Sequence, residues 1–345
     1  MNKGGTVMKI ILNSEKEIKV VHNYVKLIIT SMLVCVALVG CGISDEAKEK
    51  ADDFNRVFIK MTTEFEGDEE ELLVSTNRAN IFQALEKEYG AFFCDTWNFD
   101  LVDGKERYRH YDQVEGYPPE LADRYMVVTP NYFKFNPVNT IDNQSITEYL
   151  IQDTDVVNIL VPQKYQGRED EIESIYKEYM HFNNVVVAEI YAERIGIEED
   201  TRIMDDFEVN IIYVNDEQSY FTYKPAIAAK SNNTLNDCLV VILFENQIHP
   251  VQIAATMTRG LFYPTNWNGS QVTEQDIHST GAQYDAEDSL SKIVPVLNLY
   301  EEYQQDKLEK YVAMGVIITG SVGIIFGIVF IALKLNKKQD LNQID

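Results

Sequence analysis

Two long apolar runs without a charged residue frame the chain, at residues 27–43 and 312–333. The second run has 22 residues. At about 1.5 Å per residue a helix of that length spans roughly 33 Å, enough for a hydrocarbon core of about 30 Å. Tyr311 precedes the run and Lys334, Lys337 and Lys338 follow it, which is the usual flanking pattern of a membrane span. The pattern therefore predicts a transmembrane helix over 312–333 and a cytoplasmic tail over 334–345.

The first run, 27–43, is short for a span and slightly long for the core of a signal peptide. Lysines in residues 1–26 indicate that this leader is cytoplasmic. Leu38-Val39-Gly40-Cys41 resembles the bacterial lipobox, in which the chain is cut before the cysteine and the thiol carries diacylglycerol. Either Cys41 is lipidated or the run stays as an uncleaved anchor. We favour the anchor, because a C-terminal span leaves little need for a lipid. Both outcomes place 44–311 outside the cell.

Between the two runs, apolar positions alternate in some segments and recur every three or four residues in others, which predicts an α+β domain flanked by two transmembrane helices. We expect strands over 124–128, 155–161, 207–214, 220–223 and 238–244. Residues 215–219 are expected to form the loop of a hairpin. We expect helices over 44–66, 77–89, 168–182 and 285–311, the last continuing into the membrane and coupling the domain to it.

Charge is distributed unevenly along the chain, which has 30 basic and 55 acidic residues. Five lysines and two glutamates lie before Cys41, and three lysines and two aspartates follow Tyr311. The intervening segment therefore has 22 basic and 51 acidic residues, a net charge of −29. Such a segment offers no basic face for phosphates, which excludes nucleic acid as a partner. The charge keeps an exported domain soluble and is compatible with a cationic peptide ligand.

Two cysteines, Cys94 and Cys238, lie in the acidic segment. Outside the cell they could form one disulfide, which would close a long loop and stabilise the fold. Both also stand next to apolar residues, and independent burial as small hydrophobic side chains is an equally good reading. The sequence leaves these alternatives open.

No catalytic or cofactor motif is present, such as HExxH, GxSxG or a phosphate-binding GxxxxGK. The histidines at 110, 181, 249 and 278 stand alone, and the acidic clusters 198–200 and 205–206 lack the ligand spacing of a calcium loop. We therefore expect no catalytic residue, no cofactor and no metal site, and a protein that is not an enzyme.

Three glycines in the second apolar run, Gly320, Gly323 and Gly327, fall on one face of the predicted helix. Gly323 and Gly327 form a GxxxG pattern, which allows a second helix to approach closely. The pattern predicts a transmembrane partner subunit packed against this face.

Four segments resemble the bacteriocin-associated integral membrane protein family. Thr129–Val138 (TPNYFKFNPV) is similar to its PNYLK-x-NPI stretch, and Ile159–Tyr165 (ILVPQKY) to its LLVPEKY stretch. Residues 211–214 with 220–223 (IIYV and YFTY) resemble its hairpin, and 240–243 the strand after it. The resemblance covers roughly Thr129 to Phe244 and depends on the order and spacing of these short motifs.

Members of that family look like ABC-transporter permeases that work with a separate ATPase in bacteriocin export or self-immunity. The resemblance thus implies a non-enzymatic membrane component whose partners are membrane lipid, a transmembrane subunit, an ABC ATPase and a cationic peptide. Such permeases have further spans after the second one, whereas this chain ends at Asp345. A truncated reading frame, half of a split permease and an accessory subunit all fit. The rival hypothesis is a surface protein lipidated at Cys41 that binds a cationic peptide without a transporter.

Overall fold

The structure is a computed structural model that describes residues 26, 44–60, 65–102, 105–108, 117–225, 233–310 and 312–313. The chain divides into a unit of Ile43–Tyr300 and a second unit of Met1–Gly42 with Glu301–Asp345. The predicted spans 27–43 and 312–333 lie outside the described residues, apart from Val312 and Ala313. None of the helices in the described ranges combines the length and apolar character that crossing a bilayer requires.

A mixed sheet of eight strands forms the centre of the Ile43–Tyr300 unit, in the order β14-β1-β11-β2-β5-β10-β6-β7. The pairs β5/β10 and β6/β7 are parallel, and the other neighbours are antiparallel. The strands are β1 (Phe54–Ile59), β2 (Phe92–Asp95), β5 (Tyr125–Val128), β6 (Val156–Pro162), β7 (Glu208–Val214), β10 (Leu239–Ile242), β11 (Leu261–Pro264) and β14 (Leu290–Pro295). The predicted mixture of helices and strands in one domain is confirmed.

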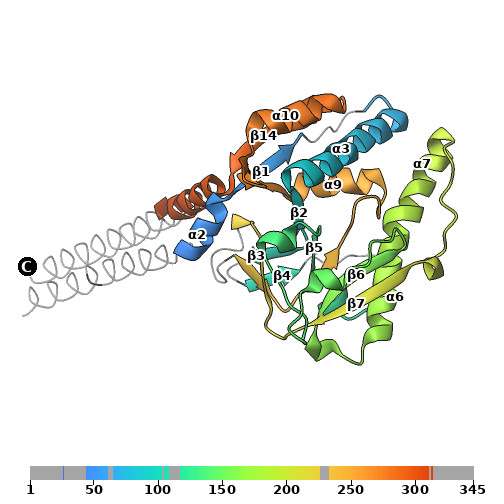
Figure 1. Ribbon diagram of the computed structural model, residues 1–345, viewed down its shortest axis with the longest axis horizontal. Coiled ribbons are helices and arrows are strands. Elements are labelled where there is room, and N and C mark those ends of the chain that lie inside the picture. Colours follow the sequence, from blue (N-terminus) through green and yellow to red (C-terminus); the bar gives the residue numbers. More distant parts are fainter. Residues whose placement is uncertain are drawn as a thin grey trace, which may run out of the picture. The chain divides into compact units, whose positions relative to one another are not determined.

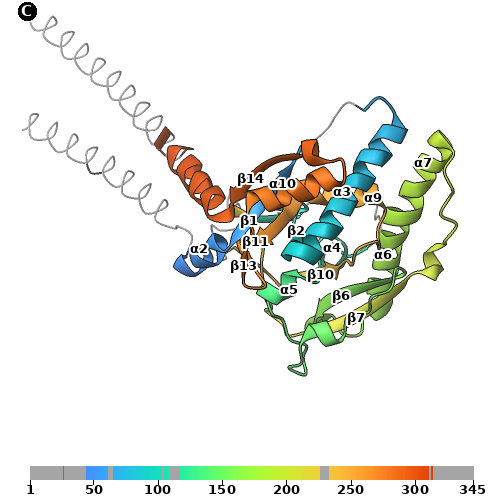
Figure 2. The same ribbon diagram turned by 45° about the horizontal axis from the view of Figure 1, so that its top comes forward.

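Helices accompany this sheet, as Figures 1 and 2 show. The longer ones are α3 (Asp68–Tyr89), α6 (Glu169–His181), α7 (Val187–Ile195), α9 (Pro250–Gly260) and α10 (Glu274–Gln283). The short ones are α2 (Asp45–Asp52), α4 (Pro119–Ala122) and α5 (Tyr132–Phe135). The 3-10 turns are η1 (Ile146–Glu148), η2 (Gln163–Tyr165), η4 (Met204–Asp206) and η6 (Glu287–Ser289), and η3 (Phe182–Val186) is a π-helical segment joining α6 to α7. Residues 296–310 are also helical.

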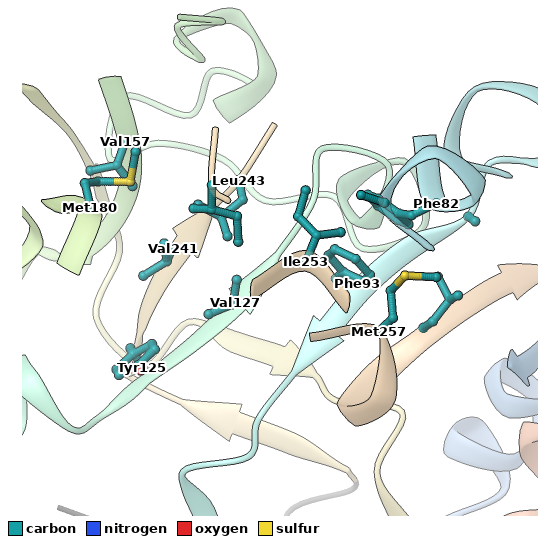
Figure 3. Close-up of a cluster of buried hydrophobic side chains, with 14 of the residues drawn as sticks. Phe82, Phe93, Tyr125, Val127, Val157, Met180, Val241, Leu243, Ile253 and Met257 are labelled. Atoms are coloured by element: carbon teal, nitrogen blue, oxygen red, sulfur yellow. The ribbon is translucent and has the colours of Figure 1, made fainter. Parts of the chain in front are cut away.

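Alternation along the central strands divides the interior into two cores, because successive strand residues point to opposite faces of the sheet. In β10, Leu239 and Val241 belong to the first core and Val240 and Ile242 to the second. The first core lies under the helices, and Figure 3 shows Phe82 of α3 and Ile253 and Met257 of α9 beside Phe93 of the sheet. Apolar side chains therefore cover both faces of the central strands, with Asp95 of β2 and Asn158 of β6 as buried polar exceptions.

The second core lies on the other face and is covered mainly by short elements. It joins Ala47 and Ala51 of α2, Tyr132 of α5, and Val296 and Tyr300 at the start of the 296–310 helix. Two small two-stranded sheets contribute to it: β3 (Phe99–Val102) with β4 (Lys105–Tyr108), and β8 (Ser219–Phe221) with β9 (Thr234–Asn236). A third small sheet, β12 (Asn266–Trp267) with β13 (Ser270–Gln271), packs Trp267 against the first core. The first residues and the last residues of the unit therefore pack in one apolar cluster.

Most local predictions agree with the structure. The strands expected over 124–128, 155–161, 207–214 and 238–244 are β5, β6, β7 and β10, and the helix over 168–182 is α6. The helix expected over 77–89 forms and begins earlier, at Asp68. These segments carry their periodicity in an unbroken local pattern.

Three predictions were wrong. Residues 44–66 do not form one helix, because α2 ends at Asp52 and β1 follows. Residues 285–295 are η6 and β14, so the helix expected from 285 begins only at 296. Both errors have one cause. Strand β1 pairs with β11 and β14, which lie more than 200 residues away in sequence, so the local pattern of these segments does not show that they are strands.

The third error concerns the hairpin expected around residues 215–219. Strand β7 pairs in parallel with β6 over seven residues, from Val156↔Glu208 to Pro162↔Val214. The short strand β8 pairs instead with β9. Burial explains the difference, since β7 gains a long buried neighbour in the main sheet that the three residues of β8 could not supply.

Candidate functional site

A surface pocket of about 510 Å³ lies beside α2. Its volume is within the usual range for small-ligand sites, about 300–1,000 Å³. Four separate segments meet there: the first turns of the unit, the chain after α5, strand β8 and strand β9. The lining residues are Ser44, Glu46, Ala47, Lys50, Asn136, Pro137, Val138, Ser219, Phe221, Thr234 and Asn236. We take this pocket as the candidate functional site.

Helix α2 forms one wall, and its sequence explains why it is helical. Ser44 caps it, with its hydroxyl accepting a hydrogen bond from the backbone N–H of Ala47 at 3.2 Å. Acidic residues occupy its first turn and Lys50 its last turn, which complements the helix dipole. Ala47 and Ala51 are buried in the second core, so the helix turns Lys50 toward the pocket at the edge of that core.

Lys50 is the cation of the pocket. Its ammonium lies 5.0 Å from the centre of the Phe221 ring, within cation–π range. Burial lowers the pKa of Lys50, and the carboxylate of Glu46, one turn earlier on the helix, opposes that change. Within the described residues Lys50 forms no ion pair. The pocket thus holds a half-buried positive charge in a strongly acidic domain.

Asn136 supplies a second wall. Its side-chain amide donates to the carbonyl of Tyr132 at 2.9 Å and to the hydroxyl of Tyr223 at 3.0 Å, which fixes the turn after α5. The side-chain oxygen of Asn136 is buried and accepts no hydrogen bond from the described residues. An unmet acceptor costs about 1–3 kcal/mol. This wall therefore carries a polar group that is still unsatisfied.

The third wall is the small sheet of β8 and β9. The hydroxyl of Ser219 donates to the side-chain oxygen of Asn236 at 2.7 Å, and that of Thr234 does so at 3.4 Å. The oxygen of Asn236 is thereby occupied, and its NH₂ group remains as a donor. An ion pair of 2.9 Å between Lys164 and Asp237 ties the end of β9 to the turn after β6.

Two of the four segments that resemble the family line this pocket, and a third is joined to one of its walls by an ion pair. The first, Thr129–Val138, ends in the wall residues 136–138. The segment 220–223 contributes Phe221 to the lining. The segment Ile159–Tyr165 contributes Lys164, which holds the β8–β9 sheet through Asp237. These segments are far apart in sequence and serve one local structure.

Cys94 and Cys238 form no disulfide, and both are buried. Of the two alternatives left open by the sequence, the structure has independent burial. The thiol of Cys94 donates to the carbonyl of Thr222 at 3.3 Å, and burial raises its pKa well above the ordinary value. A thiol of this kind is a poor nucleophile, because only the thiolate reacts readily.

Of the histidines and acidic residues singled out from the sequence, His249, Asp200 and Asp206 have clear structural partners. The imidazole of His249 caps α9 by accepting a hydrogen bond from the backbone N–H of Val251 at 3.4 Å, and its ring stacks on that of Tyr191. Asp200 pairs with Arg202, and Asp206 caps the 3-10 turn η4. Across the described part of the chain, three or more His, Cys, Asp or Glu side chains nowhere gather in a way that could hold a metal ion.

The other residues singled out from the sequence, Cys41, Gly320, Gly323 and Gly327, lie outside the described residues. The pocket itself escaped sequence analysis, because Lys50, Phe221 and Asn236 meet only in the folded chain. Asn136 had one signal, its place in a segment that resembles the family. Comparisons with protein-family models, with curated proteins and with solved structures give no match.

Proposed function

We propose that this chain is a membrane-anchored, non-enzymatic component of a bacteriocin-associated ABC transporter or immunity system, whose extracellular domain binds a peptide or a partner. The observation that carries the proposal is that two of the resembling segments, Thr129–Val138 and 220–223, line one pocket, while Lys164 of a third holds its β8–β9 wall. Segments far apart in sequence that converge on one pocket support a binding role, and the same segments also supply core residues such as Tyr132 and Val161.

The arrangement of the domain's two ends supports the two anchors. Strand β1, which follows α2, pairs antiparallel with β14, which precedes the 296–310 helix. Asn55 lies opposite Pro295 in this pairing. The chain therefore enters and leaves the sheet at the same end of two neighbouring strands. A domain held by both ends in one bilayer needs this arrangement.

The pocket favours binding over chemistry. Its lining combines one ammonium, one carboxylate, two amides, three hydroxyls and several apolar side chains. This mixture provides hydrogen bonds and contact area for a ligand. It lacks the hydrogen-bonded pair of nucleophile and base that group transfer generally requires. This composition supports the non-enzymatic role that we propose.

Topology is tested with a protease site inserted after Glu199, in the exposed segment 197–199. We expect protease added to intact cells to cut this site. The same site inserted after Lys338 should be cut only after the cells are permeabilised. Protection of the first site, or recovery of the chain in the soluble fraction, would contradict the proposal.

The partner is tested by purification in mild detergent. We expect an ABC-type ATPase to co-purify with the chain, and Gly323→Leu to reduce its recovery through loss of close helix packing. Ala332→Leu, in the same run but off the glycine face, is the control. The mass of the mature N-terminus tests the alternative: a diacylated Cys41 without an ATPase partner would favour the lipid-anchored binding protein.

A further inference from the structure

We propose that the pocket beside α2 captures the C-terminal carboxylate of a cationic peptide, with Lys50 as the paired cation and Asn236 as a second donor. This inference rests on the proposed function and deepens it by naming the ligand class. It has two physical parts, the donors that the pocket offers and the charge of the domain around it.

The two donors come from different elements of the pocket lining. Lys50 projects from α2 and has no ion-pair partner within the described residues, so its three N–H groups are available. Asn236 lies on β9, and its oxygen already accepts from Ser219 at 2.7 Å, so the amide presents its N–H groups. A carboxylate has two oxygens that accept from separate donors, which matches an ammonium and an amide in the lining of one pocket.

The pocket that holds these donors also has apolar side chains in its lining. Phe221, Ala47, Pro137 and Val138 line the pocket and are suited to the side chain of a terminal residue. A peptide end combines one carboxylate with one side chain of this kind. Capture of a peptide's C-terminal carboxylate is a recurrent mode of peptide recognition.

The charge of the domain selects the rest of the ligand. The segment between the two apolar runs has a net charge of −29, which attracts cations and repels anions at long range. An anionic lipid headgroup would oppose this field. A cationic peptide is drawn in by it and brings one group of the opposite sign, its terminal carboxylate. Lys50 then recognises that group at short range.

Binding would also relieve an unfavourable state of the free pocket. Burial lowers the pKa of Lys50, so the charged ammonium is held there at a cost. An incoming carboxylate restores a favourable environment for the charge. A ligand that binds only the folded protein thereby stabilises it, by an amount that grows with the logarithm of ligand concentration above Kd.

The probe is a pool of heptapeptides with three fixed lysines followed by four random residues, made once with free C-termini and once amidated. The purified full chain in phosphatidylcholine nanodiscs is immobilised, and retained peptide is measured. We expect the free-acid pool to be retained about tenfold more than the amidated pool, as for a charge-assisted contact. Equal retention, or none of either pool, would overturn the inference.

Two variants test the named donors. Lys50→Met keeps the apolar stem and Asn236→Asp keeps the shape, and each should abolish the preference for free C-termini. Lys48→Met is the matched control, because this lysine lies on the same helix outside the pocket lining and is half-exposed beside Asp45. Unfolding curves of each variant show that the fold is kept. Retention unaffected by both pocket variants would overturn the inference.

The lipid is tested in the same assay. If Lys50→Met alters retention only in phosphatidylglycerol nanodiscs, its cation serves a lipid headgroup and the peptide assignment is wrong. In nanodiscs both sides of the membrane are open to the peptide, so this assay does not depend on topology. A negative result therefore does not change the outcome of the topology and ATPase experiments. Conversely, peptide capture in a chain without an ATPase partner would leave the inference standing and contradict the transporter role.

Discussion

At the scale of single residues, burial raises the pKa of two carboxylates, Asp95 and Glu86. Asp95 is 1% exposed, and burial raises its pKa, while Arg259 and the backbone N–H of Trp97 oppose the shift. Glu86 is half-buried near Glu245, Lys134 and Thr129. The charge of Asp95 is balanced by Arg259, whereas the raised pKa of Glu86 makes that group change its protonation between about pH 4.5 and about pH 7.

The Asp95–Arg259 pair joins the end of β2 to the end of α9, with Nε and Oδ2 at 2.5 Å. Arg259→Met would leave a buried carboxylate without its cation. Loss of one partner of a buried pair costs about 3–5 kcal/mol, and the partial exposure of Arg259 reduces this to about 2 kcal/mol. Urea unfolding of the purified protein measures the loss.

The control for this prediction is Arg194→Met, which removes an ion pair with Asp68 whose two side chains are 57% and 33% exposed. We expect a cost below about 1 kcal/mol there. Addition of Asp95→Asn to Arg259→Met should recover part of the lost stability. If both single arginine variants cost the same, the buried pair is not the cause.

Glu86 makes stability depend on pH. Burial chiefly raises its pKa from the ordinary 4.5 to about 7, with repulsion from Glu245 adding to the shift. Between these values the folded protein binds more protons than the unfolded chain, so this group's contribution to stability falls as pH rises from about 4.5 to about 7. We expect Glu86→Gln to remove that fall and to stabilise the protein at pH 8 by about 1–2 kcal/mol, after allowance for solvent screening.

The measurement is the difference in unfolding free energy between the wild type and Glu86→Gln across pH 5 to 8. Glu88→Gln is the control, since Glu88 is exposed on the same helix. A difference that is constant with pH, or one that grows toward pH 5, would contradict the prediction.

At the scale of elements, α3 and α7 end in the same way and differ in what surrounds the end. Gly90 and Gly196 each follow the helix with φ near +70°, where an L side chain is strained. A Cβ on Gly90 would lie 2.4 Å from the ring of Trp267, whereas a Cβ on Gly196 would meet nothing within 4 Å.

This contrast predicts unequal effects of one substitution. Gly196→Ala should cost about 1 kcal/mol, which is the penalty of the left-handed conformation. Gly90→Ala should cost about 3 kcal/mol, because the Trp267 ring must also move and lose its packing. Thermal unfolding of the two variants compares them. Equal costs would show that the Trp267 contact adds nothing.

The helix from Glu169 to Ile195 shows how a distant loop shapes an element. Its middle is the π-helical segment Phe182–Val186. There the carbonyl of Asn183 accepts from the backbone N–H of His249 at 3.2 Å, and the amide of Asn184 donates to the carbonyl of Gln247 at 2.8 Å. The widened turn thus connects the helix to the chain before α9. No local pattern in the helix announces it.

At the scale of the whole molecule, net charge opposes compaction. The segment between the apolar runs has a net charge of −29, and like charges repel one another in the folded state. We expect the melting temperature of the purified protein to rise as sodium chloride increases from about 0.02 to about 0.5 M, since salt screens this repulsion. Measurement in sodium sulfate separates screening from surface exclusion. A constant or falling melting temperature in chloride would contradict the prediction.

The sequence determined those elements whose periodicity is local and complete. The apolar runs of β6 and β10 and the amphipathic pattern of α6 are legible in any conformation of the chain. The mixed fold class and the two apolar runs at the ends follow from the same kind of reading. Burial of its apolar side chains favours each of these elements, whichever part of the chain it packs against.

Only the tertiary structure decided the rest. The local sequence of β1 and of β14 predicts a helix for each. Each segment is a strand because it pairs in the folded chain, β1 with β11 and β14, and β14 with β1. The pocket joins Lys50, Asn136 and Asn236 from three distant segments. Pairing and convergence of this kind depend on contacts across about 90 to 240 residues, and no window along the sequence contains them.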